Sequence, residues 1–409
     1  MYVLFEQGNM EKIPIRIACV LLVLITGIAA CDKLMPGVPA DDSILDGPVE
    51  GLSPEQSAQF IRGDFAFNDE IFTPETGLGP LFVATSCGTC HAGDGKGHPF
   101  TTLTRFGQKD STGNQFLGHG GPQLQQRAII NYQPESLPEG ATFSRFTPPA
   151  NTGLGFLNAV SDADLLALAD PDDADGDGIS GRPNWIHVPA YIQPKPGSIT
   201  RANKYIGRFG KKAAAHDLLH QTVLAYNQDI GICSSYEPYD TYHHQEIDPE
   251  ISNQTVLDVV AYLAMLKAPI QRDPQHPEVQ AGKKIFIDLG CGKCHTPELK
   301  TGTSPIAALS QKTFAPYSDL LMHDMGPDLD DGYTEGSAAT AEWRTPPLWG
   351  LGLSKKAQGG QYFLLHDGRA QSIETAITAH GGEAAASRSA FIALDATSKA
   401  RLLKFLESL

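Results

Sequence analysis

The chain has 409 residues, which is long enough for two or three domains, and 41% of them are hydrophobic, which excludes a disordered polypeptide. Lys and Arg number 31 against 47 Asp and Glu, and the resulting net charge of −16 leads us to expect no nucleic-acid partner. The 41 Gly and 29 Pro predict long loops between short elements.

The beginning of the chain has the pattern of an export signal. Lys12 and Arg16 precede an apolar run over residues 17–30, which is too short to span a bilayer with margin. The run ends at Cys31. Later apolar runs are all shorter than the roughly 18 residues of a membrane-spanning helix, so the remainder is predicted to be a soluble domain.

Residues 28–31, Ile-Ala-Ala-Cys, resemble the lipobox of bacterial lipoproteins, in which the Cys is lipidated and becomes the new N-terminus. On this interpretation residues 1–30 are a signal peptide, Cys31 carries the lipid and residues 31–52 are a spacer. The alternative is an ordinary signal peptide with an incidental Cys. The lipoprotein interpretation predicts a protein on the periplasmic side of the bacterial cell envelope, tethered to a membrane by its lipid anchor.

Two long helices are predicted for the first half of the chain. Ser53-Pro54-Glu55 has the N-cap residue, first-turn proline and acidic first turn of a helix start, and the pattern runs to about Ile71. Apolar residues at helical spacing predict a second helix over residues 255–266, which Pro269 ends.

Two copies of the sequence CxxCH occur, at residues 87–91 and 291–295. Two thiols at this spacing can form thioethers with both vinyl groups of a haem, and the adjacent His then becomes the proximal iron ligand. The alternatives, a zinc ribbon or a redox dithiol, are disfavoured in an exported chain that lacks the second Cys or His pair. The motifs therefore predict two covalently bound haem c groups, attached at Cys87, Cys90, Cys291 and Cys294, with His91 and His295 as proximal ligands.

A second pair of segments points to duplication. Residues 145–149, Arg-Phe-Thr-Pro-Pro, are echoed by residues 344–348, and each follows its CxxCH at a similar distance. Each half also ends in a predicted helix, the second over residues 395–408. We therefore predict a mainly α protein with two cytochrome c-like domains in tandem, over residues 53–270 and 271–409, with a large insertion in the first.

Residues 173–178 match half of a calcium-binding loop, with carboxylates at alternate positions and a glycine for the sharp turn. A plain acidic turn is the alternative. Asn184 stands where such loops usually carry a bidentate Glu, which predicts weaker affinity for Ca²⁺. The candidate ligands are Asp173, Asp175, Asp177, Ile179 and Asn184.

Together these features resemble the di-haem oxidoreductase family of peroxidase-like proteins, also called thiol oxidoreductase-like, which is related to bacterial di-haem cytochrome c peroxidases. The resemblance covers most of residues 53–409 and rests on both CxxCH motifs and on residues 175–184, 206–210, 344–352 and 366–369. It implies an oxidoreductase that reduces peroxide or a related small-molecule oxidant at the first haem. Electrons would come through the second haem from a small periplasmic donor, and relatives hold a calcium between their haems and are often homodimers.

The sixth ligand of each iron decides the chemistry, because a haem with two strong protein ligands carries electrons while an open one can bind peroxide. Ser372 caps a predicted helix that places His380 on its buried face, and the resemblance makes His380 the sixth ligand of the second haem. Met325 is the competing candidate. For the first haem His119 is a candidate, while the resemblance favours an open sixth position.

One departure from the family concerns a Trp that relatives tend to place between their haems. The segment after Gly210 reads Lys211-Lys212-Ala213, so electron transfer between haems would need another route, for which Trp185 and Trp343 are candidates.

Three functions remain open from the sequence. The first is the peroxidase-like enzyme, and the second is an electron-transfer cytochrome c lipoprotein with both haems six-coordinate. The third is oxidation of a partner protein. The thiol oxidoreductase label adds nothing, because Cys233 has no partner outside the haem motifs and is expected to be a buried free thiol.

Overall fold

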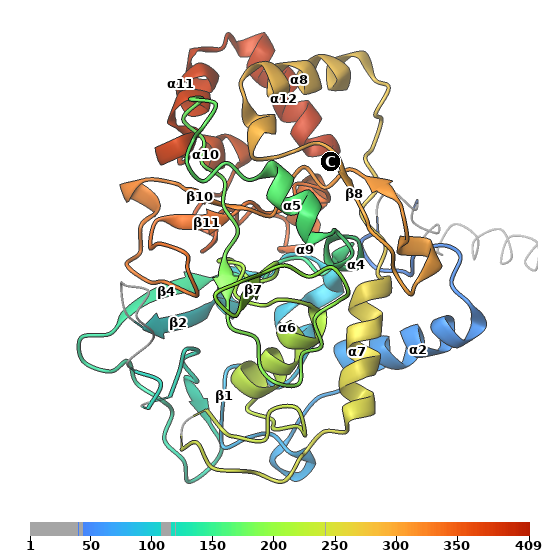
Figure 1. Ribbon diagram of the computed structural model, residues 1–409, viewed down its shortest axis with the longest axis vertical. Helices are drawn as coiled ribbons and strands as arrows, with labels where there is room; N and C mark the ends of the chain where they lie inside the picture. The colour runs from blue at the N-terminus through green and yellow to red at the C-terminus, as the bar shows by residue number, and fades with distance from the viewer. Residues whose placement is uncertain (1–39, 41–43, 108–115, 119, 242) are drawn as a thin grey trace, which may run out of the picture. The chain divides into compact units, whose positions relative to one another are not determined.

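The computed structural model describes residues 40, 44–107, 116–118, 120–241 and 243–409. Residues 42–409 form one compact unit (Figure 1), separate from a unit of residues 1–41. The predicted signal peptide, Cys31 and most of the predicted spacer lie outside the described residues. Among the helices that are described, none has the length and apolarity needed to cross a bilayer.

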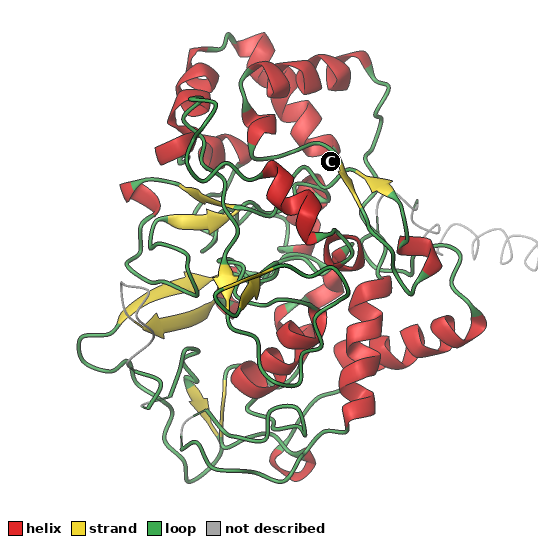
Figure 2. Ribbon diagram, viewed as in Figure 1, coloured by secondary structure: helices red, strands yellow, loops and turns green. Residues whose placement is uncertain are grey.

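Helices and short strands alternate along the chain (Figure 2). The α-helices are α2 (Pro54–Asp64), α3 (Cys87–Cys90), α4 (Leu154–Asn158), α5 (Asp162–Leu168), α6 (Leu218–Leu224), α7 (Asn253–Met265), α8 (Pro277–Asp288), α9 (Ser354–Ala357), α10 (Ile373–Thr378), α11 (Ala385–Ala393) and α12 (Ala396–Ser408). The strands are β1 (Leu81–Phe82), β2 (Leu103–Gly107), β3 (Arg127–Ala128), β4 (Thr142–Phe146), β5 (Trp185–Ile186), β6 (Thr200–Arg201), β7 (Lys204–Ile206), β8 (Leu299–Lys300), β9 (Thr313–Phe314), β10 (Met322–Asp324) and β11 (Glu342–Arg344).

The strands pair into small antiparallel sheets, which corrects part of the fold expectation. The pairs are β1–β3, β2–β4, β8–β9 and β10–β11, with β5–β7–β6 as a three-stranded sheet. Helix is more abundant than strand, but the fold is not clearly mainly α as the sequence predicted. The strands went unpredicted because most have two or three residues, too few to show an alternating pattern.

The first hydrophobic core is built around α2 and α7, which cross closely in Figure 1. Ser53 caps α2 as predicted, since its hydroxyl accepts a hydrogen bond from the backbone N–H of Gln56 at 3.2 Å. Gly63 permits the close crossing, because a Cβ there would lie 2.0 Å from the backbone oxygen of Asp258. Phe60 and Phe67 pack on Tyr262 at centroid distances of 4.9 and 5.5 Å.

The second core lies between α8 and α12, which run side by side near the top of Figure 1. Gly282 allows this approach, since a Cβ there would lie 2.1 Å from the backbone oxygen of Arg401. Phe286 stacks edge-on against Phe405 with centroids 5.4 Å apart. The first helix pair precedes residue 270 and the second follows it, while the division into two cytochrome c-like domains stays a prediction.

Candidate haem site

A cavity of about 470 Å³ lies between the two cores and is lined by both CxxCH motifs. The first motif lies on α3, which Ser86 caps through a 3.2 Å hydrogen bond from the backbone N–H of Thr89. The second lies on a short turn of helix at Cys291–Lys293. The fold therefore brings together two motifs that are about 200 residues apart in sequence, as a di-haem interpretation requires.

The motif cysteines are poorly suited to act as a redox dithiol. Burial, supported by the charge of Asp229, raises the pKa of Cys87 to about 12, and burial also raises that of Cys90 to about 12. A reactive dithiol needs a lowered thiol pKa. The thiol environment therefore favours haem attachment over dithiol redox chemistry for the first CxxCH motif.

Both predicted proximal histidines are oriented in the same way. The Nδ1 atom of His91 lies 2.9 Å from the backbone oxygen of Pro149, and that of His295 lies 3.0 Å from the backbone oxygen of Tyr317. A carbonyl only accepts, so each Nδ1 carries the proton and each Nε2 keeps its lone pair. Burial lowers the pKa of both rings to about 4, which keeps them neutral and able to bind iron.

The structure brings both sequence candidates for the second sixth ligand to the cavity wall. His380 follows α10, and its Nδ1 lies 2.7 Å from the backbone oxygen of Ala376, which leaves Nε2 with a free lone pair. Burial lowers the pKa of His380, and His380 lines the same cavity as His295. Met325 also lines the cavity but packs with Leu329 and Trp343.

The surroundings of the first motif are different. The charged groups that act on Cys87, Cys90 and His91 include Asp229, Glu70, Arg127 and Lys211. His119 lies outside the described residues. His98 does not line the cavity; its ring stacks on Phe100 at a centroid distance of 4.5 Å.

The wall of the cavity nearest the first motif carries polar residues that the sequence did not single out. Arg105 on β2 forms an ion pair with Glu335, and its Nη1 donates to Gln228 Oε1 at 3.0 Å. Burial raises the pKa of Asp229 to about 7, against the opposing effect of Arg105. Asp229 and Gln228 belong to a turn of π-helix, Ala225–Ile230, within the predicted insertion.

Several buried polar atoms in the wall lack a protein partner. A buried polar group without a hydrogen bond is costly, so a cluster of them around a largely apolar cavity indicates a ligand with polar edges. These unpartnered polar atoms and the orientation of His91 and His295 both fit a haem in the cavity. The unpartnered wall atoms are Thr147 Oγ1, Asn151 Nδ2, Thr152 Oγ1, Thr222 Oγ1 and the Tyr226 hydroxyl.

A comparison with known families agrees with this site. The family model described as "Di-haem oxidoreductase, putative peroxidase" matches residues 144–409. The chain belongs to the di-haem oxidoreductase family. The second CxxCH lies within the matched residues, while the first precedes them and is tied to the second by the shared cavity.

Two other comparisons add little to this family assignment. No curated protein matches the chain. A solved structure of Kuenenia stuttgartiensis hydrazine synthase pressurised with 20 bar xenon is similar with a TM-score of 0.41 and 15% identity, over 92% of this chain and 98% of that chain.

In this di-haem oxidoreductase the predicted calcium loop keeps only part of its expected ligand set. Carboxylate oxygens of Asp170, Asp173 and Asp175 lie within 4.8 Å of one another, so two predicted ligands come together with one that was missed. Asp177 instead pairs with Lys293 at 2.8 Å. Asn184 is buried, and its side-chain amide donates to the backbone oxygens of Lys212 and Glu335. The amide is therefore used in these hydrogen bonds. Ile179 lines the haem cavity.

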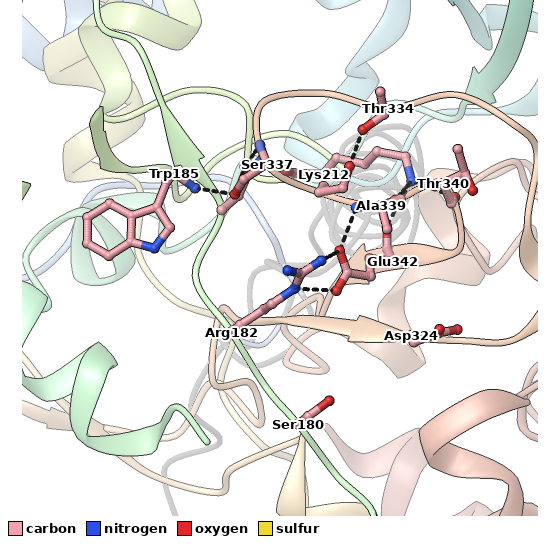
Figure 3. A network of polar contacts seen from close by, with 12 residues as sticks. Ser180, Arg182, Trp185, Lys212, Asp324, Thr334, Ser337, Ala339, Thr340 and Glu342 are labelled. Carbon is pink, nitrogen blue, oxygen red and sulfur yellow. Dashed lines mark hydrogen bonds and ion pairs between the residues drawn. The ribbon is translucent and has the colours of Figure 1, made fainter. Parts of the chain in front are cut away.

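The two lysines after Gly210 occupy different environments. Lys212 is buried, and its Nζ donates to the backbone oxygens of Ala339, Thr340 and Glu342 at 3.2, 2.9 and 2.8 Å. Figure 3 shows this ammonium beside the bidentate ion pair of Arg182 and Glu342. Lys211 instead lines the cavity.

Lys212 also contacts an aromatic ring. Its Nζ lies 3.8 Å from the ring centroid of Trp343, and His366 stacks on Trp343 with centroids 3.7 Å apart. Trp343 lines the cavity, whereas Trp185 does not. Of the two tryptophans considered as routes between haems, the structure brings Trp343 to the site.

Proposed function

We propose that this chain is a c-type di-haem oxidoreductase that reduces peroxide at a haem attached to Cys87 and Cys90. The electrons would reach this haem from a second one at Cys291 and Cys294. The overall reaction joins one hydrogen peroxide with two electrons and two protons to give two waters. A small periplasmic redox protein supplies the electrons and is itself oxidised. A haem supplies the iron that exchanges electrons and, where its sixth position is open, binds the oxidant.

The observation that carries this proposal is the difference between the two ends of the cavity. At the second motif His295 is joined by His380, whose free Nε2 suits it as a sixth ligand that would keep that iron closed. At the first motif the cavity wall carries the side chains of Arg105, Gln228 and Asp229, which do not bind haem iron well. One closed and one open site favours relay at the second haem and chemistry at the first.

Asp229 is suited to handle the proton of the oxidant. Its pKa of about 7 means that near neutral pH the carboxylate can take a proton from peroxide and return it to the leaving oxygen. Arg105 and Gln228 form a fixed polar wall beside it, because the guanidinium holds both Glu335 and the Gln228 side chain. Such a wall positions a small polar oxidant and stabilises negative charge that develops on it.

We also propose a cellular location, a metal site and an oligomeric state for this enzyme. Lipidation at Cys31 would hold it on the periplasmic side of the cell envelope, where calcium is available to an exposed loop. We propose a Ca²⁺ site on Asp170, Asp173 and Asp175, supported by the grouping of their oxygens. We also propose a homodimer, on the family resemblance alone.

Anaerobic reduction followed by peroxide addition tests the proposal. Purified protein should first show two covalently attached haems per chain in a pyridine haemochrome assay after denaturation. Protein reduced by two electrons should then be reoxidised by one equivalent of hydrogen peroxide. Two attached haems that peroxide does not reoxidise would leave the electron-transfer lipoprotein as the function, and absence of haem would contradict both.

A further inference from the structure

Three cationic side chains line the haem cavity close together: Lys96, Lys211 and Arg344. The backbone N–H of Arg344 donates to the Lys211 oxygen at 3.0 Å, and its Nε donates to the Gly210 oxygen at 2.9 Å. Burial lowers the pKa of Lys211, and the charges of Lys96 and Arg344 lower it further. The three cations therefore lie within one another's fields.

These cations have no carboxylate partner within the described part of the chain. Asp367 is the acid whose field reaches both Lys96 and Lys211, but its carboxylate accepts from Arg369 Nε at 2.6 Å. Lys212 differs from Lys96 and Lys211, because its ammonium donates to three backbone oxygens, while Arg344 uses Nε and Nη1 for backbone oxygens. Unpaired charges in an enclosed site are costly, so three of them at one place call for an anionic ligand.

The cations lie between the two predicted haem sites. Lys96 precedes Gly97, whose backbone N–H donates to the Pro148 oxygen at 3.0 Å, and the oxygen of the next residue, Pro149, lies 2.9 Å from His91 Nδ1 in the first motif. The charge of Arg344 interacts with Asp319, whose backbone N–H donates to the oxygen of Cys294 in the second motif at 3.1 Å. A ligand that binds these three cations must therefore carry negative charge, and this charge must lie between the two CxxCH motifs.

We propose that Lys96, Lys211 and Arg344 would bind haem propionate carboxylates in this cavity. The proposal rests on the proposed di-haem function. Each haem brings two propionates, and carboxylates are what an Arg fork and Lys ammonium groups bind well. The cations neutralise the propionates and raise the reduction potential of the haem they touch, since nearby positive charge disfavours the ferric state.

The repeat offers a matched control for these residues. Arg145 opens the first segment, Arg-Phe-Thr-Pro-Pro, as Arg344 opens the second, Arg-Thr-Pro-Pro, but Arg145 is exposed. A change at Arg145 therefore removes a charge of the same kind without touching the cavity wall near the motifs.

The test compares Lys211→Met and Lys96→Met, each made alone in case one does not fold, with Arg145→Met. Haem content is counted by pyridine haemochrome, and each midpoint potential is measured from pH 5 to pH 8. We expect two haems in all variants. We also expect a negative shift of at least one potential and a new pH dependence in the cavity variants alone, as a propionate that lost its cation becomes protonatable. Lys211→Arg should restore the wild-type values.

Two results would overturn the proposal while leaving the di-haem function in place. In the first, the cavity variants keep two haems and match Arg145→Met in potential and pH dependence. In the second, acetate added to the wild-type holoprotein shifts the haem spectrum and the shift is lost in Lys211→Met, which would assign the cations to a free anionic substrate. Absence of haem from the wild type would instead contradict the proposed function itself.

Discussion

His295 and His380 both line the cavity, and both turn Nδ1 to a backbone oxygen, so that each keeps the Nε2 lone pair. Two neutral imidazoles with free Nε2 atoms on one cavity wall are suited to the proposed role of ligands to one haem iron. Beside the Cys87 motif the wall carries the carboxyl group of Asp229 and the side chains of Arg105 and Gln228.

The His380→Ala variant tests the assignment of the second sixth ligand. Loss of the imidazole should convert that haem from low-spin to high-spin ferric iron while both haems stay attached. The measurement is the optical and EPR spectrum of the oxidised holoprotein. Met325→Leu is the control, since Met325 lines the same cavity. Conversion by the Met325 variant and not by the His380 variant would assign the ligand to the thioether.

The Asp229→Asn variant tests the proposed proton carrier. Peroxide reduction should fall about a hundredfold or more, the usual contribution of a general acid or base, with haem content unchanged. Because the carboxylate form takes the first proton, wild-type kcat/KM should rise with pH and level off above the Asp229 pKa of about 7, and the variant should lose this rise.

Glu135→Gln is the matched control for that experiment. Burial raises the pKa of Glu135 to about 7 as well, but this carboxyl does not line the cavity. An equal loss of activity in both variants would show that the effect of Asp229 is structural and not chemical.

The loop aspartates should contribute unequally to calcium binding, and the sequence alone does not show which of them contributes most. Asp175→Asn should weaken Ca²⁺ binding at least tenfold, whereas Asp177→Asn should change it little because Asp177 pairs with Lys293. Calorimetric titration of the holoprotein measures both, with expected dissociation constants of about 10⁻⁴ to 10⁻³ M, as in extracellular sites. Equal weakening of Ca²⁺ binding by both changes would instead support the ligand set predicted from the sequence, which includes both Asp175 and Asp177.

The buried ion pair of Arg208 and Asp162 should be the costliest to break. Both side chains are almost fully buried, and Arg208 Nη2 also donates to the Val160 oxygen at 3.0 Å. Arg208→Met leaves Asp162 buried without its partner and should lower the free energy of unfolding by about 3–5 kcal/mol. Denaturant unfolding measures this, with Lys284→Met as a control that breaks an exposed pair and should cost under about 1 kcal/mol.

The features that sequence reasoning predicted are those set by local spacing. The CxxCH motifs, the capped helices α2, α7 and α12 and the inward position of His380 each depend on residues a few positions apart. Helix caps and helical periodicity act over that same short range, so a single sequence reveals them.

What the sequence missed depends on contacts between distant segments. Arg105 meets Gln228 and Glu335 from two other parts of the chain, and no local pattern marks any of the three. Asn184 fits the calcium loop by counting positions, yet backbone oxygens of Lys212 and Glu335 bind its amide. A linear motif cannot predict these hydrogen bonds of Asn184, because the acceptor oxygens belong to segments that are distant in the sequence.

Low-temperature EPR of the holoprotein, fully oxidised and then reduced by one electron, distinguishes one closed and one open haem from two closed haems. We expect a high-spin ferric signal in at least one of these states, lost when cyanide is added, and a low-spin signal from the second haem in the oxidised protein. Low-spin ferric signals alone in both states would overturn this assignment, because both irons would then be closed to peroxide.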